Sequence, residues 1–387
     1  MPDGGNQLTV KAHRSVEAIG AAAWDDCAGT DNPFVSYAFF QALEASGSAT
    51  AESGWLPQPL ALEDANGRVI GVAPLYLKSH SYGEYVFDHG WAAAYERAGG
   101  RYYPKLQCAV PFTPVTGRRL LLRPDAPDGA AEALIVAMVG LAKRYKASSV
   151  HVTFPTEDQW RQLGGAGFLQ RVGQQFHWEN DGYRSFDAFL EALNSRKRKQ
   201  IRRERREANA NGIEIEMLTG DAIEPRHWDA FFRFYMSTSD RKWGSAYLTR
   251  EFFDLIGRQM PDRVLLVMAK KGARYVAGAL NLIGTDTLYG RNWGCVVDVP
   301  FLHFEACYYR AIEFAIERGL KRVEAGAQGQ HKIQRGYLPC RTFSAHWIRD
   351  ANFSAAVADF VKRETRALEH NMTELEAELS PFKALGD

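Results

Sequence analysis

Two stretches with the same ends decide how this sequence is interpreted: GFLQRVGQQFHW at residues 167–178 and GYLPCRTFSAHW at residues 336–347. Each begins with glycine, an aromatic residue and leucine, and each ends in His-Trp, with ten residues from the glycine to the histidine. One match of this kind arises easily by chance. Several matches in the same order indicate an internal repeat, which determines the fold of the whole chain.

The segments before these stretches match as well. LALEDANGRVIGVAPLYL (60–77) and LLVMAKKGARYVAGALNLI (265–283) each predict two strands around a turn, at Asn66-Gly67 and at Lys271-Gly272. A third strand is predicted after each hairpin, at 85–91 in the first half and at 287–293 in the second.

A helix and a final strand follow, in AAEALIVAMVGLAKRYKASSVHVTF and in FEACYYRAIEFAIERGLKRVEAGA. Both helices have apolar residues at helical spacing and basic residues near the C-terminus, which suits the helix dipole. The sequence therefore predicts an α/β fold with two similar domains in tandem, each a mixed central sheet flanked by helices, over 1–183 and 184–387. The first domain has extra material at 92–127 that we expect to form a functional loop.

The composition is that of an ordinary globular protein. The chain has 387 residues, 46% of them hydrophobic and 24% charged, with a net charge of +1, which argues against DNA binding and general coating of nucleic acids. The five cysteines form no CxxC pair, so we expect no disulfide framework and no metal. We expect a cytoplasmic protein, because no signal peptide and no transmembrane stretch are visible; peripheral membrane contact stays open.

A strongly basic helix is predicted at 186–210, as one helix or two abutting helices. Eight cations fall within eleven residues of it, from residue 196 to residue 206. Four of them recur at three- and four-residue spacing and so share one helical face: Arg196, Lys199, Arg203 and Arg206. This face is a candidate site for an anion such as a phosphate, a lipid headgroup or RNA, and the alternative is a solvated helix surface.

The order of predicted elements resembles the Gcn5-related N-acyltransferase fold. Two such domains, with the basic run leading into the second, resemble the Fem family of peptidoglycan interpeptide-bridge transferases. The closest resemblance is to bacterial Fem-like N-acyltransferases, through VPFTPVTGRRLL (110–121) and GQHKIQRGYLP (329–339). The resemblance covers nearly the whole chain and implies an N-acyl or aminoacyl transferase.

The segment GCVVDVPFLH (294–303) departs from the acetyltransferase pattern. Acetyltransferases of this fold hold the pyrophosphate of coenzyme A in a glycine-rich loop before the central helix. Here the glycine spacing is missing, and Asp298 would repel phosphate. The resemblance therefore leaves two donors, acyl-CoA and aminoacyl-tRNA, and Fem enzymes use the second.

Acyl transfer needs a general base, a group that stabilises the oxyanion and a cleft that aligns the substrates. In the second domain Glu324 or His331 is the predicted base, and Tyr337 is the predicted proton donor to the leaving group. Lys332 and Arg335 are predicted to bind a carboxylate or a phosphate.

The substrate side of the predicted site draws on both domains. Arg291, Asn292 and Trp293 lie at the strand end where the family fold places its acyl donor, and Asn292 is a candidate donor to the carbonyl. In the first domain an acceptor pocket is predicted around Asp88, His89, Phe112 and Thr113.

Three functional classes follow. The first is an enzyme that transfers an acyl group to a small-molecule or peptide amine, with charged tRNA as one candidate donor. The second is a non-catalytic module that binds an anionic cell-wall precursor, lipid or RNA through the basic helix. The third is a scaffold protein, for which the amphipathic segment at 353–379 would be the docking helix, although we expect this helix to pack on its own core.

Overall fold

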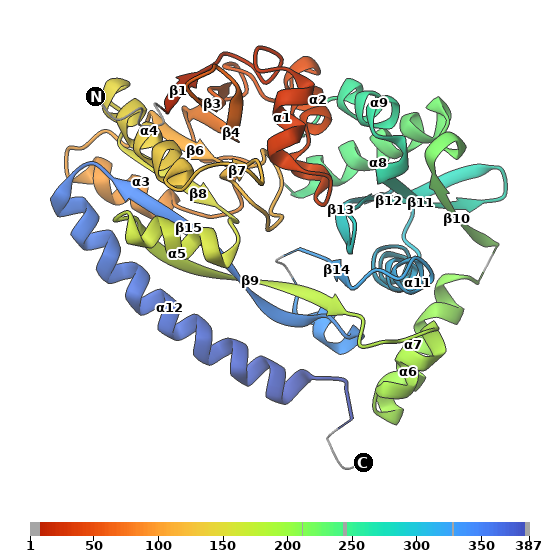
Figure 1. Cartoon of the computed structure of the whole chain (residues 1–387). Helices are drawn as coiled ribbons and strands as arrows, with labels where there is room; N and C mark the ends of the chain where they lie inside the picture. The colour runs from red at the N-terminus through yellow and green to blue at the C-terminus, as the bar shows by residue number, and fades with distance from the viewer. Residues whose placement is uncertain (1–7, 211, 243–245, 327–328, 384–387) are drawn as a thin grey trace, which may run out of the picture. The chain divides into compact units, whose positions relative to one another are not determined.

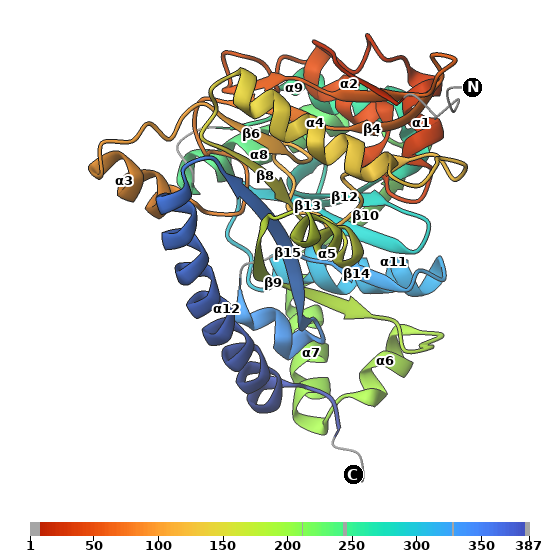
Figure 2. The same ribbon diagram turned by 60° about the vertical axis from the view of Figure 1, so that its left-hand side comes forward.

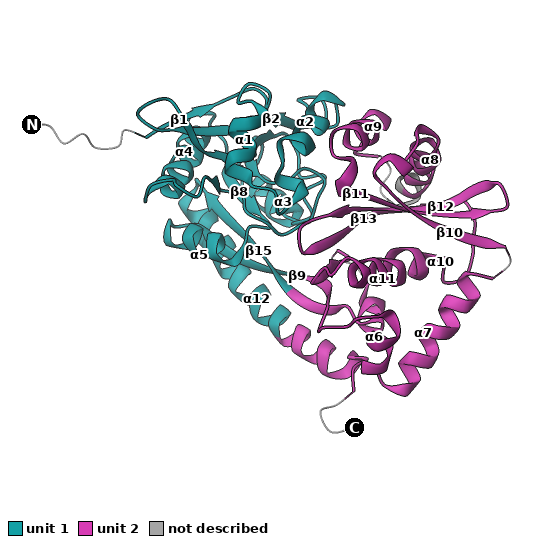
Figure 3. Ribbon diagram, turned by 45° about the vertical axis from the view of Figure 1, so that its right-hand side comes forward, with its two compact units in different colours: residues 1–173, 341–369 teal, residues 174–340, 370–387 magenta. Residues whose placement is uncertain are grey.

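The computed structural model describes residues 8–210, 212–242, 246–326 and 329–383 (Figure 1). The chain forms two compact units, shown in different colours in Figure 3. Unit 1 consists of residues 1–173 and 341–369, and unit 2 consists of residues 174–340 and 370–387.

The sheet of unit 2 has the strand order β10-β11-β12-β13-β14-β9. Its neighbours are antiparallel except β13 and β14, which run parallel. The strands are β10 (Ile213–Thr219), β11 (Val264–Lys271), β12 (Arg274–Ile283), β13 (Thr287–Cys295), β14 (Arg322–Glu324) and the second part of β9 (Leu169–Glu179).

Helices cover both faces of this sheet. On one face α8 (Pro225–Lys242) packs on β12 and β13, and α9 (Arg250–Gln259) packs on α8. The opposite face forms an apolar core with the remaining helices of the unit: α6 (Phe186–Ala192), α7 (Ser195–Ala208), α10 (Leu302–Phe304), the π-helical turn η4 (Glu305–Tyr309) and α11 (Arg310–Glu317). Figures 1 and 2 show α8 and α11 on opposite sides of β12 and β13.

Unit 1 contains two sheets, with the strand orders β15-β8-β6-β5-β2 and β1-β3-β4-β7. The strands are β1 (Thr9–Ala12), β2 (Trp55–Pro57), β3 (Leu60–Glu63), β4 (Val69–Ala73), β5 (Leu75–Lys78), β6 (Lys105–Cys108), β7 (Leu121–Leu122), β8 (Ser149–Thr153) and most of β15 (Leu338–Ile348). The helices are α1 (Ala21–Ala28), α2 (Tyr37–Ala45), α3 (His89–Arg97), α4 (Ala130–Arg144), α5 (Glu157–Gly165) and most of α12 (Ala351–Leu379).

The α12 helix packs on the core of its own unit, as predicted for this segment. Val357 and Val361 are buried in a cluster with Trp91. Phe353 stacks on Tyr95 with ring centroids 4.4 Å apart.

The two matching stretches of sequence form matching strands. Both β9 and β15 have eleven residues, and the His-Trp pair occupies the ninth and tenth positions of each. Their pairing is exchanged, however: the end of β9 pairs with β14 in unit 2, and the end of β15 pairs with β8 in unit 1. The predicted ranges 1–183 and 184–387 describe the two copies of the repeat, and as domains they remain a proposal. The compact units differ from these ranges because each takes its last strand from the opposite half of the chain.

The strand predicted at 85–91 does not form. Tyr85 has a positive φ of 60° that turns the chain, and α3 begins at His89. The strand that pairs in parallel with β8 is β6, which lies inside the predicted 92–127 loop. Part of the predicted loop is therefore a strand of the core, and all four β6 residues are buried.

The basic segment forms two abutting helices, α6 and α7. They are separated at Leu193 and Asn194, where the Asn194 side chain accepts a hydrogen bond from the Lys197 amide at 3.0 Å. This cap starts the second helix and explains why the run does not continue as one.

Candidate active site

The parallel strands β13 and β14 part at Tyr289 and Glu324, which are the last paired residues. β13 continues to Cys295, whereas β14 ends at Glu324. Gly290 allows β14 to come close, because a Cβ at this position would lie 3.2 Å from the Glu324 carbonyl oxygen. Beyond this point β13 has no strand partner on its β14 side among the described residues.

A β-bulge marks the same place. Leu280 lies opposite Asn292 and Asn281 lies opposite Gly290, so Arg291 is the extra residue on β13. Bulges turn side chains away from the regular alternation of a strand. This one sets the direction of Arg291 and Asn292 beside the gap between the strands.

A pocket of about 80 Å³ occupies the gap. The predicted residues Arg291, Asn292 and Trp293 all line it, so the structure brings this part of the predicted site together. The other lining residues come from β12, from β13, from the segment leading into α11 and from the residue after β14: Ala279, Leu280, Asn281, Gly290, His303, Cys307, Tyr308 and Ala325. The Trp293 and His303 rings lie 5.3 Å apart and form an aromatic wall.

Asn281 supplies a hydrogen-bonding group to this pocket. The side chain is 1% exposed, and its amide nitrogen donates to the Leu265 carbonyl oxygen at 3.5 Å. Its Oδ1 atom has no hydrogen-bond partner among the described residues. Because a buried oxygen without a partner is costly, this atom is a candidate acceptor for an N–H group of a ligand.

His331 does not line the pocket itself but contacts Tyr308, which does. Its Nε2 atom is 3.1 Å from the Tyr308 hydroxyl, and its ring is exposed to solvent. Burial, together with the charges of Arg335 and Lys332, lowers the pKa of His331. The imidazole is therefore neutral at neutral pH and able to accept a proton.

Glu324 is buried on β14 opposite His177 of β9. Burial raises the pKa of Glu324 to about 8, although Arg322 and Arg291 act in the opposite direction. The Oε2 atom has no hydrogen-bond partner among the described residues and lies 3.9 Å from His177 Nε2. At neutral pH this carboxyl group is mainly protonated, so it fits a hydrogen-bond donor better than a base.

Lys332 and Arg335 already have partners inside unit 2. Lys332 is 4% exposed and donates to the carbonyl oxygens of Ala325 and Gly326, at 2.5 and 3.0 Å, and burial lowers its pKa to about 8. Arg335 forms a bidentate ion pair with Glu204 at 2.8 and 3.1 Å. Both cations are part of the protein framework beside the pocket, and neither lines it.

Tyr337 lies in the core of unit 2, away from the pocket lining. It is 0% exposed, and its hydroxyl donates to the Tyr308 carbonyl oxygen at 3.1 Å. Burial raises its pKa well above the usual value. The structure therefore gives this residue a packing contact, and its predicted role as a proton donor stays a prediction.

The predicted acceptor residues of unit 1 have different surroundings. Asp88 is 2% exposed, forms an ion pair with Lys105 at 2.5 Å and accepts from the Tyr102 hydroxyl at 2.7 Å. The charge of Lys105 and its hydrogen bond hold the pKa of Asp88 below its ordinary value, against the effect of burial. His89 is exposed at the start of α3.

Phe112 and Thr113 are buried beneath the surface of the same unit. The Phe112 ring packs against Trp55 with centroids 5.2 Å apart. The Thr113 hydroxyl donates to the Pro111 carbonyl oxygen at 3.0 Å. These contacts belong to the core, so an acceptor pocket at these four residues remains a prediction.

The four cations predicted to share a helical face are all exposed on α7. The opposite side of the helix is buried through Ile201, Glu204 and Ala208. Within the described part of the chain no ion pair is formed by Arg196, Lys199 or Arg206, whereas Arg203 lies 3.6 Å from Glu207. The structure thus provides an accessible basic surface, which is what anion binding requires.

Sequence reasoning did not identify Asn281, Cys307 and Tyr308 as site residues. Asn281 interrupts the apolar run GALNLI, and an amide in a buried strand is a signal that could have been used. Cys307 and Tyr308 look like core residues of a helix. They reach the pocket because the helix is π-helical at 305–309, a feature that spacing alone does not reveal.

The mixed α/β fold, with sheets flanked by helices, agrees with the predicted fold class. Residues 15–384 match the FemAB-like family, described as peptidoglycan biosynthesis and recognition. This match spans most of the chain, so the chain belongs to the FemAB-like family. No curated protein matches the sequence.

Solved structures share the fold at low sequence identity. The crystal structure of FemX is 13% identical with a TM-score of 0.54, and the match covers 91% of this chain and all of that one. L-PGS from Bacillus licheniformis is 9% identical with a TM-score of 0.51, covering 86% and 98%. A conserved protein of unknown function from Bacteroides thetaiotaomicron is 10% identical with a TM-score of 0.51, covering 88% and 100%.

Among the described residues, no helix combines the length and the apolar character required to cross a bilayer.

Proposed function

We propose that the chain is an N-acyltransferase or aminoacyltransferase that passes an acyl group directly from a donor to an amine acceptor. One observation supports this most: the gap between β13 and β14 contains a pocket with Arg291, Asn292 and the Asn281 oxygen, which has no partner among the described residues. Membership of a family linked to peptidoglycan biosynthesis and recognition agrees with an amine acceptor of the cell wall.

In the proposed reaction the amine nitrogen attacks the acyl carbonyl carbon. The new C–N bond forms as the bond from this carbon to the oxygen or sulfur of the donor breaks. His331 removes the proton that the amine loses, because its imidazole is neutral at neutral pH and accessible. The imidazolium then returns the proton to the leaving oxygen or sulfur.

Pocket residues align the reacting groups in this proposal. Asn281 Oδ1 accepts a hydrogen bond from the amine, and the Asn292 amide donates to the carbonyl oxygen as negative charge develops there. The protonated Glu324, held opposite His177, supports the end of β14 beside the pocket. No metal ion takes part in these steps.

The donor is proposed to be an aminoacyl-tRNA, with acyl-CoA as the alternative. The four exposed cations of α7 support the first, because they would attract the phosphates of RNA. They equally support the competing proposal of a non-catalytic module that binds an anionic cell-wall precursor, lipid headgroup or RNA.

Binding and turnover measurements separate these proposals. Purified protein is mixed with an acyl-CoA series or with a pool of charged tRNA, in the presence of amine acceptors. Binding of each donor is measured by thermal shift and by direct titration, and acyl transfer is followed in the same mixtures. Transfer of a labelled acyl group to an acceptor supports the enzyme, and the active donor identifies its class. Salt-sensitive binding of RNA without any transfer would favour the binding module. If the protein shows no binding and no transfer with either donor class, both proposed donors are overturned.

A further inference from the structure

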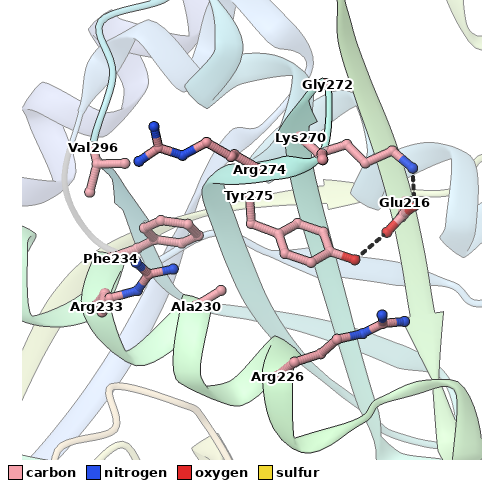
Figure 4. Close-up of a pocket in the computed structure, with 11 residues that line it drawn as sticks. Glu216, Arg226, Ala230, Arg233, Phe234, Lys270, Gly272, Arg274, Tyr275 and Val296 are labelled. Atoms are coloured by element: carbon pink, nitrogen blue, oxygen red, sulfur yellow. Dashed lines mark hydrogen bonds and ion pairs between the residues drawn. The ribbon is translucent and has the colours of Figure 1, made fainter.

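A second, larger pocket lies on the α8 side of unit 2, and it shares no lining residue with the transfer pocket. Its volume is about 540 Å³. Figure 4 shows that its lining comes from β10, from one side of α8, from the turn between β11 and β12, and from Val296. This volume is in the range of pockets that hold small-molecule ligands.

Four cations line this pocket against a single carboxylate. The cations are Arg226, Arg233, Lys270 and Arg274, and the carboxylate is Glu216, which gives the lining a net charge of +3. The four come from two elements, α8 and the β11–β12 hairpin, and Figure 4 shows Lys270 and Arg226 toward Glu216, and Arg233 and Arg274 toward Val296. Such a gathering of like charges is unfavourable unless an anion offsets it.

The single carboxylate is already engaged. Glu216 accepts hydrogen bonds from Lys270 at 2.6 Å and from the Tyr275 hydroxyl at 2.8 Å. These two hydrogen bonds lower the pKa of Glu216, so it stays ionised and bound to Lys270. It therefore positions Lys270 and Tyr275 at the wall of the pocket and does not neutralise the arginines.

The arginines differ in how far they are compensated. Arg226 pairs with Glu224 at 2.8 Å. Arg233 and Arg274 have no carboxylate within ion-pair distance in the segments that the structure describes. Guanidinium groups bind phosphate oxygens in a bidentate manner, so these two are suited to a ligand with several phosphate oxygens.

We propose that this pocket binds closely spaced phosphate groups, as in a free or an organic diphosphate. Lys270 pairs with Glu214 at 3.2 Å as well as with Glu216, so Arg233 and Arg274 are the cations left to bind the phosphate oxygens. The exposed side chain of Val296 provides apolar contact for an organic part of the ligand. The proposal does not depend on the transfer reaction.

Calorimetric titration with inorganic pyrophosphate and with ADP at 0.15 M salt tests the proposal. We expect saturable binding, and the double substitution Arg233→Gln/Arg274→Gln should weaken it by about tenfold or more. Tighter binding of ADP would show that the organic part contributes, and equal binding would show that the phosphates alone are recognised. Both results support the site.

The control is Arg97→Gln/Arg258→Gln, which removes the same charge from exposed positions outside the pocket. We expect this variant to bind like the original protein. The proposal is overturned if neither phosphate compound binds, or if the pocket variant and the control lose affinity equally. Both pairs of side chains are exposed, and thermal melting of each variant checks that the fold is intact.

Discussion

The carboxyl group of Glu324 on β14 lies directly opposite His177 on β9, with Oε2 and Nε2 3.9 Å apart. The equivalent place in unit 1 has His151 on β8 opposite His346 on β15, with their Nδ1 atoms 2.6 Å apart. Both pairs join a strand to a partner from the other half of the sequence. The repeat thus keeps the geometry of a buried polar pair, while its chemistry changes from acid and imidazole to two imidazoles.

The buried Glu324 carboxyl should make the protein less stable as pH rises, and replacing Glu324 by Gln should remove this pH dependence. The folded protein holds this proton up to a pKa of about 8, whereas the unfolded chain releases it near the ordinary glutamate pKa of 4.5. The unfolded state therefore binds fewer protons between these values, and the free energy of unfolding falls as pH rises through this window, by roughly 1–4 kcal/mol.

Denaturant unfolding at pH 5, 6.5 and 8 measures this effect. Glu324→Gln should gain stability relative to the original protein as pH increases, and exposed Glu317→Gln on α11 is the matched control. Parallel curves for the original protein and Glu324→Gln would show that the carboxyl group ionises normally.

Replacing His331 by Ala should reduce the rate of transfer by about 10²-fold or more, as expected for loss of a general base. The neutral imidazole is the active form, so activity should fall as pH drops below the lowered His331 pKa, under 6.5. The variant should lose this acidic limb as well as most of the rate.

A pH–rate profile from pH 5 to 8 tests this assignment. His370→Ala, an exposed histidine on α12, serves as the control and should behave like the original protein. If His331→Ala keeps both the rate and the acidic limb, another group is the base.

Replacing Asn281 by Leu should separate stability from activity. Leucine has a similar size and removes a buried oxygen that has no partner among the described residues, so the free energy of unfolding should stay level or rise by about 1 kcal/mol. Transfer should fall sharply, because the hydrogen bond to the acceptor amine is lost. A variant that is less stable yet fully active would assign Asn281 to the core alone.

Replacing Lys105 by Met should destabilise unit 1 strongly. The Lys105 ammonium group is 0% exposed and donates to Ser81, Glu84 and Asp88. Its loss leaves the buried Asp88 carboxyl without its ion pair and leaves Glu84 with only Lys78, 3.9 Å away, which costs about 3–5 kcal/mol. Denaturant unfolding measures the loss, with exposed Lys143→Met as the control.

The same ion pair decides between two roles for Asp88. If it is structural, adding Asp88→Asn to Lys105→Met should restore part of the lost stability, since the uncompensated charge is removed. If Asp88 binds an acceptor instead, Asp88→Asn alone should weaken acceptor binding with little change in stability.

The repeat and its strands could be predicted from sequence because glycine turns and apolar alternation are local signals. The exchange of the last strands could not, since β9 and β15 carry the same GxL…HW pattern and nothing in it selects a partner. The strand predicted at 85–91 failed for a related reason. Asp88 reads as the end of a strand, yet its ion pair with Lys105, seventeen residues on, holds it at the start of α3.

The candidate site shows the same limit. Arg291, Asn292 and Trp293 were identified by their place at a strand end, and the pocket does include them. Arg335 and Tyr337 lie within the predicted motif at 329–339, but their side chains face the core, where Glu204 and the Tyr308 carbonyl bind them. Sequence spacing gives the segment that forms a site, and burial decides which of its side chains are free to act.

Neutralising the basic face of α7 should weaken RNA binding and leave the fold intact. Arg196, Lys199, Arg203 and Arg206 are exposed, so changing all four to Gln removes no buried contact. If each cation contacts one phosphate, the slope of log K against log salt should fall by roughly 3 in magnitude, because each contact contributes about 0.7–0.9.

Binding to charged tRNA at several salt concentrations measures that slope. The control makes the same change in charge at exposed positions on other elements: Arg97, Lys143, Arg144 and Lys321. Loss of affinity and slope in the α7 variant alone would give this helix the RNA-binding role and favour an aminoacyl-tRNA donor. Equal losses in both variants would reduce α7 to a solvated surface, and the donor would then have to be sought among acyl-CoA compounds.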